Sequence, residues 1–244
     1  MHFADTGLLL SARAHGEHGA VVRILTREHG VVPAYVHGGR SRRSRAVLAP
    51  GNLLHGQFDA RREGALAQVR LELLRSRAGI AIDPFPLACL NWMTAVLAAI
   101  LPESDPHPAL YDRAAAFTEL LDAGGAALVT ARRLADLEFA LLSELGFRLD
   151  LSACAATGAQ DDLVYVSPKS GRAVSRAGAA GYETRLFPLP AYLTDPAITV
   201  KGDDVKAALA LSRRFLLRDL APDFRREDLA RLRDQIDARL LRLL

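Results

Sequence analysis

The first eighty residues contain five short apolar segments separated by turn residues, and this spacing leaves few folds open. In the segment 65–74, apolar residues alternate with polar ones, which is typical of a strand with one buried face. The predicted strands are 6–12, 20–26, 31–37, 52–60 and 65–74. The longest connection lies between the third and fourth strands. This arrangement predicts a small closed barrel, either an OB-fold or an SH3-like barrel.

That longest connection carries a dense cluster of positive charge. In "YVHGGRSRRSRAVLAPGN" (35–52), a Gly-Gly pair precedes four arginines and a Pro-Gly pair follows them. The arginines are Arg40, Arg42, Arg43 and Arg45. Arginine binds phosphate through paired hydrogen bonds and keeps its charge at any pH, so the cluster suits a nucleic-acid backbone. Four phosphate contacts would give a log–log salt slope of about −3.6 on duplex DNA and about −2.8 on single strands.

The surrounding sequence favours nucleic acid over the alternative, a merely solvated loop. Residues 1–80 carry twelve Arg and Lys against six Asp and Glu, whereas the remainder carries nineteen against twenty-two. A basic module joined to a slightly acidic one suggests a polyanion-binding part and a structural or partner-binding part. Aromatic residues for base stacking are sparse in the basic part, which indicates backbone contact. Further phosphate contacts, if they share one barrel face, are Arg13, Arg23 and Arg27.

The periodicity changes near residue 82, and the rest of the chain is mainly helical in character. The predicted helices are 87–101, 109–122, 127–145, 203–220 and 226–244. The segment 150–200 is rich in Gly, Ser, Pro and Asp and predicts an irregular insertion with short extended pieces. The fold class is therefore α+β, with a barrel domain at 1–80 and an α-helical domain at 81–244.

No sequence motif for catalysis is present. The chain lacks a P-loop, a G-x-G-x-x-G after a strand, a G-x-S-x-G and an H-E-x-x-H. Asp161-Asp162 has no third ligand for a metal, and two distant cysteines, Cys89 and Cys154, give no disulfide framework. No apolar run approaches the roughly 20 residues of a membrane span. We therefore expect no catalytic residue, no enzyme activity, no membrane contact and a cytoplasmic location.

The barrel sequence resembles the N-terminal domain of the RecO family of recombination mediators. That pattern is an apolar strand, a charged Gly-Glu turn, a strand ending in L-T, a later Gly, a Gly-plus-basic loop and an L-x-P step. The matching positions are Gly16-Glu17, Leu25-Thr26, Gly30, Gly38-Gly39, and Leu48 with Pro50. The resemblance continues into "LGFRLDLSACAATGAQDDLVYVSPKSGRAVS" and covers nearly the whole chain.

The resemblance implies an OB-fold followed by an α-helical domain and a role in RecF-type DNA repair. It implies binding of single- and double-stranded DNA, annealing of complementary strands, and help in replacing single-strand-binding protein by recombinase. The implied partners are RecR and the acidic, hydrophobic C-terminal tail of single-strand-binding protein. Such a protein would associate with the nucleoid.

One family feature is degenerate in this sequence. Many members carry a zinc knuckle of two C-x-x-C pairs in the insertion. The corresponding positions here are Cys154, Thr157, Ser175 and Gly178. One thiolate cannot hold a tetrahedral zinc ion, so we expect no cofactor and a turn held by hydrogen bonds and packing.

A partner tail that is acidic and hydrophobic needs an apolar groove with a cation at its rim. Candidate cations on the predicted helices are Arg132, Arg133, Arg213 and Arg214. Two alternative functions use the same basic cluster. One is a protein-interaction adaptor that binds an acidic partner, and the other is a small-barrel RNA-binding factor.

Overall fold

The computed structural model describes the chain except residues 1, 61, 63–64, 196 and 244. The chain forms two compact units. Unit 1 comprises Met1–Gly125 and Ala221–Arg239, and unit 2 comprises Ala126–Leu220 and Leu240–Leu244. Unit 1 therefore contains residues on both sides of the predicted boundary near residue 80.

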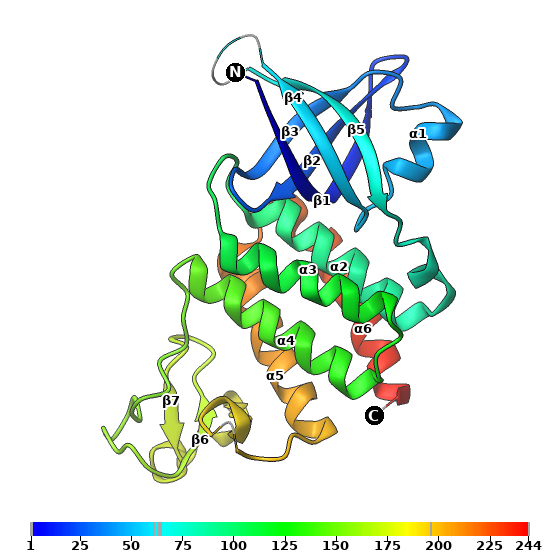
Figure 1. Cartoon of the computed structure of the whole chain (residues 1–244). Coiled ribbons are helices and arrows are strands. Elements are labelled where there is room, and N and C mark those ends of the chain that lie inside the picture. The colour runs from blue at the N-terminus through cyan, green and yellow to red at the C-terminus, as the bar shows by residue number, and fades with distance from the viewer. Residues whose placement is uncertain (1, 61, 63–64, 196, 244) are drawn as a thin grey trace. The chain divides into compact units, whose positions relative to one another are not determined.

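Unit 1 contains the five-stranded barrel that the sequence predicts (Figure 1). Its strands are β1 His2–His15, β2 Gly19–Thr26, β3 Gly30–Val36, β4 Leu53–Asp59 and β5 Ala67–Arg75. They follow one another around a closed barrel in the order β1-β2-β3-β5-β4, and β4 also pairs with β1. The β3–β5 pair is parallel and the other pairs are antiparallel. This closure is OB-like, so the predicted α+β fold class is confirmed.

Strand β1 is longer than predicted because it serves two neighbours. Its first half pairs with β4, from His2 opposite Asp59 to Leu8 opposite Leu53. Its second half pairs with β2, and the register shifts at a bulge between Leu9 and Ser11. A bulge bends a strand and increases its twist, which lets one strand turn the corner of a small barrel.

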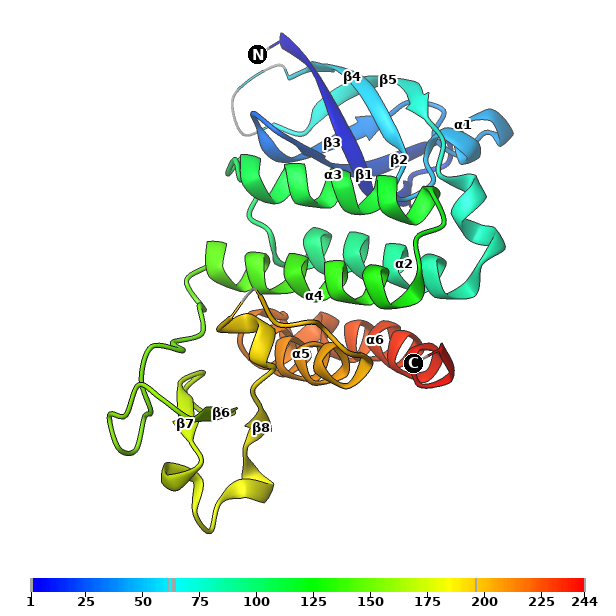
Figure 2. The ribbon, with the colours of Figure 1, turned by 60° about the horizontal axis from the view of Figure 1, so that its bottom comes forward.

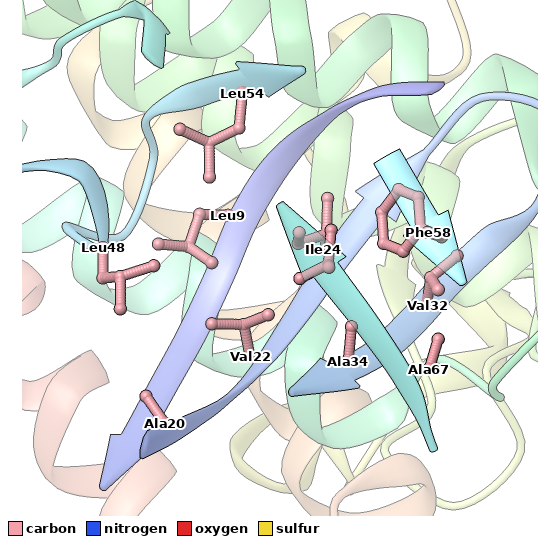
Figure 3. Packing of buried hydrophobic residues seen from close by; sticks show 11 residues of the cluster. Leu9, Ala20, Val22, Ile24, Val32, Ala34, Leu48, Leu54, Phe58 and Ala67 are labelled. Atoms are coloured by element: carbon pink, nitrogen blue, oxygen red, sulfur yellow. The ribbon is translucent and has the colours of Figure 1, made fainter. Parts of the chain in front are cut away.

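The barrel interior is filled by apolar side chains from all five strands (Figure 3). Leu9, Val22, Ile24 and Phe58 are almost fully buried and point toward one another. Leu48, from the connection after β3, lies beside Leu9 and Val22 at one end of this cluster. Burial of these side chains supplies the main stabilisation of the barrel.

The basic connection is not an open loop, because it contains the short helix α1, Arg42–Val47. Ser41 caps this helix, since its Oγ accepts a hydrogen bond from the backbone N–H of Ser44 at 3.1 Å. None of the helical residues is buried. Helix α1 therefore presents Arg42, Arg43 and Arg45 to solvent.

Three longer helices complete unit 1 (Figure 2). They are α2 Pro84–Ile100, α3 Pro108–Asp122 and α6 Asp223–Leu243. Helix α6 belongs to unit 1 up to Arg239. A 3-10 turn, η1 Ala78–Ile82, precedes α2. Asp83 caps α2, and Trp92, Met93 and Leu97 on this helix are fully buried, as its apolar sequence predicts. On α6, Arg233 is fully buried with its guanidinium over the Trp92 ring, 5.4 Å from the centroid.

Unit 2 pairs two helices and carries a small sheet. Its helices are α4 Ala127–Glu144 and α5 Gly202–Phe215, and a π-helical turn, η5 Leu216–Leu220, follows α5. The segment predicted as irregular holds a three-stranded sheet in the order β7-β6-β8. The sheet strands and 3-10 turns are β6 Leu163–Val166, β7 Ala173–Ser175, β8 Phe187–Pro188, η2 Ala177–Ala179, η3 Glu183–Arg185 and η4 Ala191–Leu193. Across the helix pair, Ser212 donates a hydrogen bond to the buried Glu138.

No helix in the described part of the chain is long and apolar enough to span a membrane.

A buried arginine ties the end of the barrel to α3. Arg77 follows β5, and its side chain is 2% exposed. Its guanidinium bonds Glu119 and also donates to Asp122 Oδ2 at 2.9 Å. The hydrogen bond from Arg77 lowers the pKa of Glu119. Arg75 reaches the same two carboxylates from a side chain that is 51% exposed.

These two arginines provide a matched test of burial. We expect Arg77→Ala to lower the free energy of unfolding by about 2–3 kcal/mol, because a charge-assisted network loses its buried member. Arg75→Ala should cost less than about 1 kcal/mol, since an exposed ion pair is screened by solvent. Urea denaturation of both variants measures the difference. Equal losses would contradict a special role for Arg77.

Candidate nucleic-acid interface

The arginines of the basic cluster lie on and beside α1. Arg42, Arg43 and Arg45 are exposed, and none of them contacts a carboxylate among the residues that the structure describes. Arg40 precedes the helix, and its Nη1 donates to the backbone carbonyls of Gly16 at 3.2 Å and Glu17 at 3.0 Å. The cluster therefore offers three guanidinium groups without a carboxylate partner and a fourth that is pinned to the β1–β2 turn.

The position of α1 is fixed by hydrogen bonds at both of its ends. At the start, Gly38 has a φ of +66°, and its carbonyl accepts from Ser44 Oγ at 2.9 Å. At the end, the buried Asn52 donates from Nδ2 to the carbonyls of Ala46 at 2.9 Å and Val47 at 3.0 Å. Asn52 Oδ1 in turn accepts from the backbone N–H of Arg77 at 2.8 Å. A basic segment held in this way loses less conformational freedom when it binds a ligand.

Arg13 of β1 joins the cluster because it lines the same hollow as two of the cluster's arginines. Arg13, Arg40 and Arg45 line one hollow of about 270 Å³, and small or apolar residues form its floor. The floor includes Ala12, Ala14, Ala20, Gly39 and Leu48. Arg13, which the sequence groups with the cluster, thus lies close to Arg40 and Arg45 in the structure.

Arg23 and Arg27 have other neighbours. Arg23 bonds Glu103 and also donates to the carbonyl of Leu101 at 3.3 Å. Arg27 grips Asp112 on α3 with two hydrogen bonds, of 3.0 Å and 3.1 Å, and lowers the pKa of that carboxyl. Both arginines therefore have acidic partners within unit 1, and neither lines the hollow beside α1.

A second, larger hollow of about 680 Å³ adjoins the first. The two hollows share Ala12 and Arg13 as lining residues. The larger one extends to Arg23 on β2 and to Ala95 and Ala98 on α2. The hollow beside α1 is therefore open at its Arg13 side and does not form a closed cup.

The four helix arginines predicted to meet a partner tail lie in unit 2, apart from its cavity. Arg132 lies over the ring of Tyr192, 5.3 Å from the centroid, and Arg133 pairs with Asp136 at 3.7 Å. Arg213 is half-buried on α5 and Arg214 is exposed. None of the four is among the described residues that line the hollow of unit 2.

That hollow has a volume of about 700 Å³ and was not predicted. Its apolar lining comprises Phe139, Leu142, Leu149, Leu151 and Leu193. Arg148 is exposed at the same hollow, which also includes Asp150 and Ser152. The signal available in the sequence was the "LGFRLDL" segment after α4, where a single arginine interrupts an apolar run.

Comparison with known proteins divides the chain near residue 80, unlike the two compact units. The model of the Recombination protein O N terminal family matches residues 1–77, and that of the Recombination protein O C terminal family matches residues 82–228. The chain belongs to the RecO family. The proteins of this family that resemble it are named DNA repair protein RecO. The resemblance predicted from the sequence motifs is therefore confirmed.

Three relatives illustrate the extent of the similarity. The DNA repair protein RecO of Methylorubrum extorquens is 47% identical over 223 residues, which cover 88% of this chain and 89% of the relative. The RecO protein of Ruegeria sp. is 43% identical over 223 residues, and that of Cereibacter sphaeroides is 41% identical over 222 residues. Each of these two alignments covers 91% of both chains.

The four positions that the resemblance assigns to a zinc knuckle, Cys154, Thr157, Ser175 and Gly178, meet in the structure. Cys154 Sγ accepts hydrogen bonds from the backbone N–H of Ser175 at 3.2 Å and from its hydroxyl at 3.3 Å. The Thr157 and Ser175 hydroxyls are 3.5 Å apart, and Gly178 donates to Ser175 Oγ at 3.1 Å. Hydrogen bonds from Ser175 and Thr157 lower the pKa of Cys154 to about 6.

These residues do not fit a zinc ion. Only one of the four positions supplies a thiolate, and a side chain at Gly178 would begin 2.7 Å from the Cys154 sulfur. Among the described residues, no three His, Cys, Asp or Glu side chains are grouped as metal ligands. Hydrogen bonds centred on Cys154 and Ser175 connect three of the four positions.

We expect purified protein to contain less than stoichiometric zinc and to keep its melting temperature in the presence of a chelator. The physical reason is that one thiolate and two hydroxyls form a poor tetrahedral site. Elemental analysis and thermal unfolding with and without EDTA measure both quantities. One zinc ion per chain, or a chelator-dependent melting temperature, would contradict the expectation.

Proposed function

We propose that this chain is a DNA-binding recombination mediator of the RecF-type repair pathway. In this role it binds single- and double-stranded DNA, anneals complementary strands and assists the replacement of single-strand-binding protein by recombinase. The observation that carries the proposal is the set of arginines on α1, which extend from an OB-like barrel without carboxylate partners in the described chain. Membership of a family of DNA repair proteins supports the same role.

The chemistry of annealing fits a surface of this kind. Two DNA backbones repel each other, and arginines that neutralise phosphates reduce this repulsion while the bases stay free to pair. Arg42 and Arg43 are suited to this task because they point into solvent. Such a mechanism requires no bond to be made or broken, so it requires no catalytic group.

The hollow in unit 2 supports a proposed site for the acidic, hydrophobic tail of single-strand-binding protein. Its five apolar residues would accept the hydrophobic side chains, and Arg148 would pair with a carboxylate. This proposed site differs from the one predicted from the sequence, because Arg132, Arg133, Arg213 and Arg214 do not line the hollow. RecR remains a proposed partner on the strength of the family alone.

The first prediction concerns the exposed arginines of α1. In the double variant Arg42→Ala/Arg43→Ala, we expect weaker binding of single-stranded DNA and a log–log salt slope smaller by about 1.4, because two phosphate contacts are lost. Fluorescence anisotropy at several salt concentrations measures the slope. Arg70→Ala is the matched control, since Arg70 is an exposed arginine on β5 outside the cluster.

Unchanged affinity and slope in the double variant would refute DNA binding through α1. Parallel titrations with RNA of the same sequence and with an acidic protein separate the alternatives. A DNA mediator should bind DNA with the arginine-dependent salt slope and anneal strands coated with single-strand-binding protein. Arginine-dependent binding of the acidic protein alone would favour the adaptor function.

The second prediction concerns the tail. We expect Arg148→Glu to weaken binding of a C-terminal tail peptide of single-strand-binding protein about tenfold, because an attractive charge becomes repulsive beside the apolar hollow. Arg214→Glu makes the same charge change outside the hollow and should have little effect. Peptide titration by anisotropy measures both variants. The reverse ranking would favour the helix arginines.

A further inference from the structure

The strongest unassigned feature of the molecule is the hollow at the mouth of the barrel beside α1. A helix that plugs a barrel end usually buries apolar side chains there, but α1 buries none. Leu48 and the partly buried Val47 pack against the barrel core, and the strand residues that line the hollow include the small Ala12, Ala14 and Ala20. The short side chains of the floor and the exposed position of α1 together leave the hollow of about 270 Å³.

The charge around this hollow is all of one sign. Arg13 reaches it from β1, Arg45 from α1 and Arg40 from the segment before α1. No acidic residue lines it among the described residues. Three guanidinium groups around a small hollow with no counter-charge suit a compact anion with several acceptor oxygens, which is the chemistry of a phosphate group.

One of the three groups is already held in position. The two hydrogen bonds from Arg40 Nη1 to the carbonyls of Gly16 and Glu17 fix its guanidinium, while its Nε and Nη2 make no bond in the described chain. Arg13 and Arg45 have no acidic partner within that part of the chain. A ligand therefore meets one immobilised guanidinium, that of Arg40. The other two, Arg13 and Arg45, can bind it without first breaking an ion pair with a carboxylate.

We propose that this hollow is the seat of one internal phosphodiester of a DNA strand, gripped jointly by Arg13, Arg40 and Arg45. The proposal rests on the proposed function, because it assumes that α1 contacts DNA. An internal phosphodiester fits better than a terminal phosphate because the hollow is open along Ala12 and Arg13 toward the larger hollow. A backbone can therefore enter on one side and leave on the other.

This geometry divides the arginines of the barrel into two classes. Arg13, Arg40 and Arg45 share a single phosphate in the seat, whereas Arg42 and Arg43 each meet a separate phosphate outside it. Counterion release counts the phosphates that are neutralised and not the arginines that touch them. The two classes therefore differ in how much salt dependence each lost arginine removes.

The experiment compares two double variants and one filled hollow, with single-stranded DNA as the probe. We expect Arg13→Ala/Arg45→Ala to reduce the salt slope by at most about 0.7, against about 1.4 for Arg42→Ala/Arg43→Ala. We expect Ala14→Leu to lower affinity about fivefold, since its longer side chain occupies the hollow without changing charge. Ala4→Leu is the control, an exposed alanine on the other half of β1. Circular dichroism checks that all variants fold.

The outcomes separate this inference from the proposed function. If Arg42→Ala/Arg43→Ala weakens binding but Ala14→Leu behaves like Ala4→Leu, the seat is refuted and DNA binding through α1 stands. If neither double variant weakens binding, the proposed function fails as well. Oligonucleotides with a 5′-hydroxyl or a 5′-phosphate test the internal assignment. Equal losses for the Arg13/Arg45 variant on both support it, and a loss confined to the 5′-phosphorylated strand overturns it.

Discussion

A single buried side chain, the amide of Asn52, holds the basic surface and the barrel together. Its nitrogen satisfies two carbonyls at the end of α1, and its oxygen accepts from the backbone of Arg77, which anchors α3. Its own carbonyl accepts from Leu9 at 3.0 Å, next to the bulge of β1. Buried polar groups are costly unless every one of them is paired, so this amide tolerates few alternative arrangements of the three segments. The orientation of α1 is therefore a property of the barrel and not of the six residues of the helix.

The arginines of unit 1 differ in function because their neighbours differ. Arg23, Arg27 and Arg77 lie where carboxylates of the α2–α3 region approach the barrel, and their charges are neutralised there. The arginines around α1 lie where no carboxylate approaches within the described chain. The same side chain thus stabilises the fold in one place and remains available to an external anion in the other. Net charge alone cannot distinguish the two groups.

The features that could be predicted from the sequence are those that depend on the local pattern of apolar and polar residues. Five strands, the barrel class and most helix positions followed from the alternation and periodicity of apolar residues. Helix α1 was not predicted, because its six residues are too few to give a periodic apolar signal. Its last two carbonyls are bonded by Asn52, which lies beyond the helix in the sequence. Glu103 and Asp112, which pair with Arg23 and Arg27, lie about eighty residues away in the chain, so spacing could not reveal them. The hollow beside α1 is lined by residues from β1, β2 and the segment around α1, and their proximity appears only in three dimensions.

The division of the chain into units has a consequence for how the protein is made. Unit 1 begins with the first strands but is completed by residues 221–239, where the buried Arg233 covers Trp92 of α2. Contacts between segments so far apart form late, because the intervening chain must first be synthesised and its loop closed. During translation, the apolar surface of α2 around Trp92 has no cover from α6 until residues 126–220 of unit 2 have left the ribosome. The apolar surface of α2 thus leaves the ribosome well before α6, the helix that covers it, and stays exposed on the nascent chain in between.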